Sequence, residues 1–128
     1  MSDEVVGVER IGQIAVVVKD VDRAADFYEK VLGLKLLFRF PGLAFFECGG
    51  VRLMLSKAER PEFDHNSIIY YRVPDVASAA GVLERRGVVL EGQPHVVHRD
   101  ERHELWMAFL RDSEGNYLGL MQEKPIAA

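Results

Sequence analysis

The sequence has little of what marks a secreted or membrane-spanning protein. Its single cysteine, Cys48, excludes a disulfide within the chain. No apolar run approaches the roughly 18–20 residues that a membrane-spanning helix needs. The first residues, Met-Ser-Asp-Glu, are acidic and lack the apolar core of a secretion signal. Together these absences favour a cytoplasmic location and disfavour a membrane partner.

Positive charge is also scarce. The 16 Lys and Arg residues stand against 20 Asp and Glu residues, which gives a net charge of −4. This balance disfavours nucleic acid as a partner, because binding to phosphates depends on cationic side chains. The other proportions are ordinary for a globular protein, with 48% hydrophobic and 28% charged residues. We therefore expect a single domain that spans residues 1–128.

An internal repeat of about 55 residues is the main feature of the sequence. A run of β-branched and small residues predicts a strand at Ile11–Val18. Asp20 is a good N-cap for the helix that follows, and Gly33 is suited to end that helix. Turn signals then separate three further expected strands, at residues 34–40, 43–48 and 51–56.

The second half repeats this order. A strand at Ile68–Val73 precedes Asp75, the N-cap of a helix that Gly87 closes. Further strands are expected at residues 88–90, 104–110 and 117–121, with a polar segment before the second of them and a turn before the third. The sequence thus predicts an α+β fold of two βαβββ modules, at residues 11–56 and 66–123, joined by a polar linker at 57–65.

Strand periodicity predicts which face of each sheet the helix covers. In the first strand Ile14, Val16 and Val18 form the more apolar face, which suits the apolar stripe of the helix. Two curved sheets that face each other would enclose a cleft of ligand size on the opposite side. The side chains expected there are Gln13, Ala15, Val17, Arg52, Met54, Ser56, Ile68, Tyr70, Arg72, Tyr117, Gly119 and Met121.

Four segments resemble a known superfamily: residues 11–20, 27–33, 49–55 and 112–116. With them the chain resembles the vicinal oxygen chelate superfamily, which includes glyoxalase I, extradiol dioxygenases and the bleomycin-resistance proteins. The resemblance implies a curved-sheet cleft built by two βαβββ modules, the glyoxalase/bleomycin-resistance/dioxygenase fold. It also implies a homodimer.

The resemblance further implies where the metal ligands of the family would fall, on the first and last strands of each module. These positions carry Gln13, Met54, Ile68 and Gly119 in this chain. An amide is a poor ligand, a thioether does not suit a hard ion, and the other two side chains offer no donor. We therefore predict no cofactor at the usual site. A divalent metal would need relocated ligands, such as His98, His103 and Glu104 with Glu47.

Three residues are weak catalytic candidates, each with an ordinary alternative. His98 and His103 lie in the polar stretch 95–104, which is either a solvated loop or a lid that brings an acid–base histidine over the cleft. Glu47 interrupts an apolar run, so it either faces solvent or is a cleft carboxylate with a raised pKa. Cys48 is better explained by packing than as a nucleophile.

Arginines and aromatic residues are the candidate ligand-binding groups. Arg52 and Arg72 either bind a carboxylate or phosphate, which a guanidinium holds through two parallel hydrogen bonds, or pair with a surface glutamate. Tyr70 and Tyr117 either bind a ligand or fill the cavity. Trp106, with Met107, Phe38, Phe45 and Phe46, either stacks on a ligand or packs in the core, because strand parity is undecided there.

The sequence leaves two functions open. The first is a protein that binds a small polar or anionic organic molecule in its cleft without the usual divalent metal, as in the bleomycin-resistance branch. The alternative is a lyase, isomerase or dioxygenase-like enzyme, either metal-free or with relocated metal ligands. A weaker third hypothesis is an interaction module whose cleft is filled by its own side chains.

Overall fold

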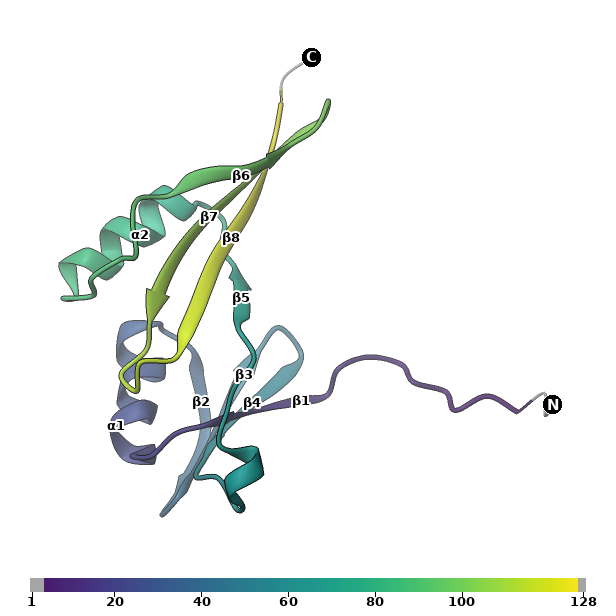
Figure 1. The fold of residues 1–128 in the computed structure, drawn as a ribbon, viewed down its shortest axis with the longest axis vertical. Helices are drawn as coiled ribbons and strands as arrows, with labels where there is room; N and C mark the ends of the chain where they lie inside the picture. Colours follow the sequence, from purple (N-terminus) through teal and green to yellow (C-terminus); the bar gives the residue numbers. More distant parts are fainter. Residues whose placement is uncertain (1–3, 127–128) are drawn as a thin grey trace.

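The computed structural model describes residues 4–126 and consists of two four-stranded sheets, each with one helical segment against one face (Figure 1). The first sheet has the order β1-β4-β3-β2, and the second has the equivalent order β5-β8-β7-β6. In each sheet the first and last strands pair in parallel and the other neighbours are antiparallel. The strands are β1 (Gln13–Val17), β2 (Lys35–Phe40), β3 (Leu43–Cys48), β4 (Val51–Ser56), β5 (Ile69–Arg72), β6 (His95–Arg99), β7 (His103–Arg111) and β8 (Tyr117–Pro125). The predicted α+β fold of two βαβββ units is confirmed.

Both helices begin at the predicted aspartates. The Asp20 carboxylate accepts a hydrogen bond from the backbone N–H of Arg23 at 3.1 Å, at the start of α1 (Val21–Asp26). The Asp75 carboxylate does the same for Ser78 at the start of α2 (Val76–Arg85). Helix α1 continues as a π-helical segment, η1 (Phe27–Val31). Each of these side chains satisfies a backbone donor that would otherwise lack a partner.

The predicted helix-covered faces are confirmed in the strands that alternate cleanly. Two apolar clusters fill the space between sheet and helix. Val16 and Val18 are buried in the first cluster, and Leu118 and Leu120 in the second. Burial of each such side chain contributes about 1.5–3 kcal/mol to stability. The opposite, concave face of each sheet therefore carries the residues that the sequence assigned to it.

The second strand of the second half is not where the sequence placed it. The segment 88–90 forms no strand, and Leu90 makes only an isolated bridge with Leu110. The strand is instead β6, which pairs with β7. The polar stretch 95–104, predicted as a loop or lid, is thus a strand hairpin. All five residues of β6 are exposed. β6 is an edge strand with neither face buried, so its sequence shows no apolar alternation that would have predicted it.

The turn before β8 fastens the two halves together. The Asp112 carboxylate is buried and accepts hydrogen bonds from the Tyr28 hydroxyl at 2.7 Å and from two backbone N–H groups of its own turn. The neighbouring Glu114 carboxylate accepts the backbone N–H groups of Lys19 and Asp20 at 2.6 and 3.1 Å. A side chain from the second half therefore accepts hydrogen bonds from the backbone just before the first helix.

Two further contacts cross between the halves. The Asn66 side chain pairs with both backbone groups of Val17, at 2.8 and 2.9 Å, and donates to Asn116 at 3.0 Å. The Arg86 guanidinium donates to the carbonyl oxygen of Val31 at 2.7 Å, near the end of η1. Asn66 follows the linker, in which η2 (Pro61–Phe63) is a single 3-10 turn. Within residues 4–126, neither α1 nor α2 is long and apolar enough to cross a membrane.

Candidate functional site

The strand register gathers most of the predicted site residues on the two concave faces. On the first sheet Gln13 lies opposite Arg52. On the second sheet Tyr70 lies opposite Gly119, and Arg72 opposite Met121. Both faces are open within one chain, since Phe40 on the first sheet is 52% exposed and Tyr70 on the second is 45% exposed.

Three aromatic rings lie on the concave face of the first sheet. The ring centroids of Phe38 and Phe45 are 5.2 Å apart, and those of Phe38 and Phe40 are 5.8 Å apart. The Arg52 guanidinium lies 5.8 Å from the centroid of Phe45. We call Phe38, Phe40 and Phe45 the first aromatic cluster. It presents flat apolar surface with a cation beside it.

An equivalent group lies on the second sheet. Tyr70 meets Phe109 edge-on at 5.9 Å, and Phe109 stacks on Tyr117 at 5.4 Å with an interplanar angle of 21°. The Arg111 guanidinium lies 5.0 Å from the centroid of Tyr117. We call Tyr70, Phe109 and Tyr117 the second aromatic cluster. Each half thus offers three rings and one arginine, although the residue types differ.

Gly119 allows the second aromatic cluster to form. A Cβ atom at this position would lie 2.7 Å from Cδ1 of Tyr70 and 3.2 Å from Cε1 of Phe109. Contacts that short do not occur without displacement, so any side chain at 119 would move the Tyr70 ring. The Tyr70 ring therefore takes the space that a side chain on this strand would otherwise fill.

The four positions where the family would hold its metal do not fit a divalent ion. The Gln13 amide donates to the Met54 sulfur at 3.8 Å, while Ile68 has no donor atom and the Tyr70 ring covers Gly119. An amide and a thioether are not a ligand set for a hard divalent cation. Across residues 4–126, no group of three or more His, Cys, Asp or Glu side chains is placed to bind a metal.

The other acidic and histidine candidates have separate local roles. The Glu47 carboxylate accepts the backbone N–H of Gly50 at 2.7 Å and so holds the β3–β4 turn. Glu104 pairs with Arg99 and accepts the indole N–H of Trp106 at 3.2 Å. His98 and His103 lie exposed on the paired strands β6 and β7, rather than on a lid. We therefore assign no catalytic step to these residues.

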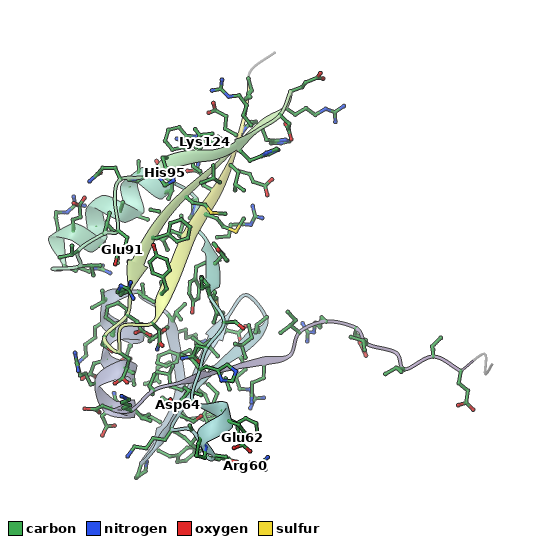
Figure 2. All side chains as sticks on the ribbon, in the orientation of Figure 1. Arg60, Glu62, Asp64, Glu91, His95 and Lys124 are labelled. Atoms are coloured by element: carbon green, nitrogen blue, oxygen red, sulfur yellow. The ribbon has the colours of Figure 1, made fainter. Side chains whose placement is uncertain are left out.

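Trp106 lies on the helix-covered face of β7, and not on the concave face where the ligand contact was predicted. It is packed against the helix-covered cluster of the second half. The ammonium of Lys124, labelled on β8 in Figure 2, lies 4.1 Å from the centroid of its ring. The concave face of β7 carries Leu105, Met107 and Phe109 instead, as their pairing with Glu123, Met121 and Gly119 shows. Phe46 is likewise fully buried in the first apolar cluster.

Phe40 and Phe109 are the two members of the aromatic clusters that the sequence analysis did not name. Strand β7 has apolar residues on both faces, so alternation alone does not choose between Phe109 and its neighbours. Gly119 could have predicted an aromatic neighbour at this place, because an isolated glycine inside a strand indicates close approach by another group.

Arg72 has one partner at the end of β5. Its guanidinium lies 3.4 Å from the Glu123 carboxylate, and its side chain is 65% exposed. An exposed pair of this kind contributes little to stability. The arginine therefore remains available to an anionic ligand, at the position opposite Met121 on β8.

A cavity of about 470 Å³ lies between the two halves and is lined mainly from the helix-covered faces of the two sheets. Its lining is mostly apolar and includes Ile14, Leu53 and Ile69, with the Cys48 thiol and Tyr71 among them. Burial, followed by the nearby charge of Glu47, raises the pKa of the Cys48 thiol. A thiol with a raised pKa is a poor nucleophile at neutral pH, which supports a packing role for Cys48.

The family follows from a match over most of the chain. Residues 10–120 match the model of the Glyoxalase/Bleomycin resistance protein/Dioxygenase superfamily. The chain belongs to this superfamily. The predicted resemblance is thereby confirmed, and the two sheets described above are the glyoxalase/bleomycin resistance fold.

Solved structures of superfamily members are similar to the chain. A lactoylglutathione lyase from Agrobacterium tumefaciens is 25% identical, with a TM-score of 0.69 over 90% of this chain and 94% of that one. TnmS3, an antibiotic binding protein from Streptomyces sp. CB03234, is also 25% identical, with a TM-score of 0.74 over 92% of this chain and 98% of that one. The comparison with curated proteins finds no match. Glyoxalase-fold proteins at this similarity thus include both a lyase and a ligand-binding protein.

Proposed function

We propose that this superfamily member binds a small organic molecule with a flat apolar body and an anionic end, on its concave faces and without the divalent metal of the family. The observation that carries the proposal is the pair of aromatic clusters, with Arg52 against a ring of the first cluster and Arg72 on the strand that carries Tyr70 of the second. Flat rings bind flat ligands by stacking and edge contacts, at about 0.5–1.5 kcal/mol for each aromatic pair. An arginine adds charge-assisted hydrogen bonds to a carboxylate or phosphate.

The similarity to an antibiotic binding protein supports binding over catalysis. The lyase among the similar structures favours the alternative enzyme activity. The residues at the four family metal positions weigh against that alternative, because none supplies a carboxylate or an imidazole. We therefore propose binding as the function, in the cytoplasmic location that the composition favours.

A homodimer would complete this ligand site. Phe38 and Phe40 are 46% and 52% exposed in a single chain, so one chain leaves its first aromatic cluster open to water. Ligand sites usually bury most of the ligand surface. A second copy facing the concave side would provide that enclosure and cover the exposed rings.

A panel of three probes tests the proposed ligand class. Calorimetry with 2-naphthoate, 2-naphthol and acetate separates the flat body from the charge. We expect 2-naphthoate to bind best, 2-naphthol more weakly and acetate not measurably. Arg52→Ala and Arg72→Ala should each weaken 2-naphthoate by about tenfold, which corresponds to one charge-assisted hydrogen bond. Arg85→Ala is the matched control, since Arg85 is exposed in the last turn of α2.

Two results would contradict the proposal. One is the absence of 2-naphthoate binding at millimolar concentration. The other is an unchanged affinity in both the Arg52 and the Arg72 variants, which would exclude their role in binding an anion.

A further inference from the structure

The cavity between the two halves is separate from the aromatic clusters. Its volume of about 470 Å³ lies within the range of cavities that bind small molecules. The aromatic clusters lie on the concave faces, whereas this cavity is lined mainly from the helix-covered faces. It is therefore a second place where the chain can enclose a ligand.

The first half supplies one wall of the cavity. Its helical segment ends next to Gly33, which takes the left-handed φ of 79° that turns the chain toward β2. The wall combines the two leucines beside this glycine with residues of β1, of β4 and of the β3–β4 turn, namely Leu32, Leu34, Ile14, Cys48, Gly49, Val51 and Leu53. Most of these side chains are aliphatic, so this wall is apolar.

The second half supplies the other wall with strand β5, which lies beside the β3–β4 turn (Figure 1). Residues 69–73 all line the cavity, although successive side chains of a strand point to opposite faces. Because β5 is an outer strand of its sheet, its open edge borders the cavity. A ligand there is within reach of residues from both faces of β5.

Arg72 is the only charged side chain among the described residues that line the cavity. It also borders a second hollow, with Gln122 and Glu123, and its side chain is 65% exposed, which places it at the mouth of the cavity. The Cys48 thiol adds no negative charge at neutral pH, because burial and then the charge of Glu47 raise its pKa. Apolar walls with one cation at the mouth suit an amphipathic anion.

We propose that this cavity binds a medium-chain monocarboxylate, with the alkyl chain between the two halves and the carboxylate on Arg72. Each methylene that the apolar walls remove from water favours binding. The guanidinium holds the carboxylate through charge-assisted hydrogen bonds. The inference rests on the proposed function only through the anion-binding role of Arg72, and it assigns a different ligand class to a different place.

Glu123 competes with such a ligand for Arg72. Its carboxylate lies 3.4 Å from the guanidinium, in an exposed pair that contributes little to stability. A ligand carboxylate can therefore replace it. Glu123→Gln removes both the competitor and its repulsion of an anion, so this variant should bind the ligand more tightly.

Calorimetry with octanoate, 1-octanol and butyrate tests the ligand class. We expect octanoate to bind with a Kd at or below about 1 mM, 1-octanol at least about fivefold more weakly, and butyrate not measurably. Arg72→Ala should weaken octanoate by about tenfold and leave 1-octanol within about twofold, whereas Glu123→Gln should strengthen octanoate by about threefold. Arg85→Ala is the matched control, since Arg85 is exposed in the last turn of α2.

The single cysteine reports whether the ligand is in the cavity. Because Cys48 lines the cavity, saturating octanoate should slow its reaction with a disulfide reagent by at least about fivefold. Saturating 2-naphthoate on the concave faces should leave that rate unchanged. This measurement uses the unaltered protein, so it does not depend on any variant folding.

A substitution that fills the cavity gives a second test of the place. Val51→Trp should weaken octanoate by at least about tenfold and leave 2-naphthoate within about twofold. Val89→Trp is the matched control, because Val89 is 86% exposed and lies after α2. Urea unfolding of both variants checks that they are folded.

Three results would overturn the proposal. They are the absence of octanoate binding at about 10 mM, an unchanged Cys48 rate in saturating octanoate, and an octanoate affinity that Arg72→Ala does not alter. Phe38→Ala separates this proposal from the proposed function, because it should weaken 2-naphthoate by at least about threefold and leave octanoate unchanged. Loss of 2-naphthoate binding with octanoate binding intact contradicts the proposed function alone, and the reverse contradicts this inference alone.

Discussion

The hydroxyl of Tyr28 donates a 2.7 Å hydrogen bond to the carboxylate of Asp112, across 84 residues of sequence and between the two halves of the molecule. Burial, and then the charge of Asp112, raise the pKa of Tyr28 well above its ordinary value. The hydroxyl therefore stays protonated, and remains a donor, above the pH at which a free tyrosine ionises. Because Asp112 also holds its own turn, this bond ties the helical segment of the first half to the last turn of the second.

Replacing Tyr28 with Phe should lower the free energy of unfolding by about 1–3 kcal/mol, because the buried Asp112 carboxylate loses a donor. Urea unfolding measures the loss. Tyr71→Phe is the matched control, since the buried Tyr71 hydroxyl has no hydrogen-bond partner among the described residues. That change should stay within about 0.5 kcal/mol of the unaltered protein. Equal losses in the two variants would show that the Tyr28–Asp112 bond is not the cause.

Gly119→Ala should displace the Tyr70 ring and cost about 1–3 kcal/mol of stability through overpacking. The same substitution should cost much less in a Tyr70→Ala background, where the clashing ring is gone. A double-mutant cycle from urea unfolding measures this coupling. Additive effects would mean that the ring swings into solvent without cost and that Gly119 is not needed for its placement.

Trp106 is the single tryptophan of the chain, so its fluorescence reports on one place. Because Trp106 packs on the helix-covered side, a ligand bound at the concave aromatic clusters should not stack on it. We expect 2-naphthoate to bind calorimetrically while Trp106→Phe leaves its affinity unchanged within about twofold. A large loss of affinity in this variant would place the ligand on the helix-covered side of the sheet.

The Cys48 thiol should react slowly with a disulfide reagent in the folded protein. Burial and the Glu47 charge raise its pKa, so less thiolate is present at a given pH. We expect a rate several-fold below that of the urea-unfolded chain near pH 8. The folded rate should still be rising at a pH where the unfolded rate has levelled off. Matching pH profiles for the two states would contradict the raised pKa.

The sequence predicts most of the fold because its signals are local. Asp20 and Asp75 each precede an apolar helical stripe, and each caps a helix as expected. Strands β1 and β4 and the first half of β8 have one apolar face, and in all three that face lies against a helix. Alternation and capping act within a few residues, so a single sequence is enough to read them.

Prediction fails where the deciding contacts are distant or the pattern is ambiguous. Strand β6 is exposed and polar, so neither apolar alternation nor turn signals mark it. Irregular register between Leu36 and Phe38 in β2, and between Val96 and His98 in β6, breaks the alternation of faces in these two edge strands. The position of Trp106 depends on packing against α2, which only the tertiary fold reveals. The cross-bonds of Glu114 and Asn66 leave no local signal at all.

The Glu114 carboxylate accepts hydrogen bonds from the backbone N–H groups of Lys19 and Asp20, and this contact affects the order in which the chain can fold. During synthesis the first half emerges with these two amide groups and the Tyr28 hydroxyl still without their native partners. Those partners arrive only when the turn at residues 112–116 has left the ribosome. Contacts of such long sequence separation slow folding and couple its late steps. Although the molecule is built from a repeat, its first half reaches its final stability only when the second is complete, so the two halves form one cooperative folding unit.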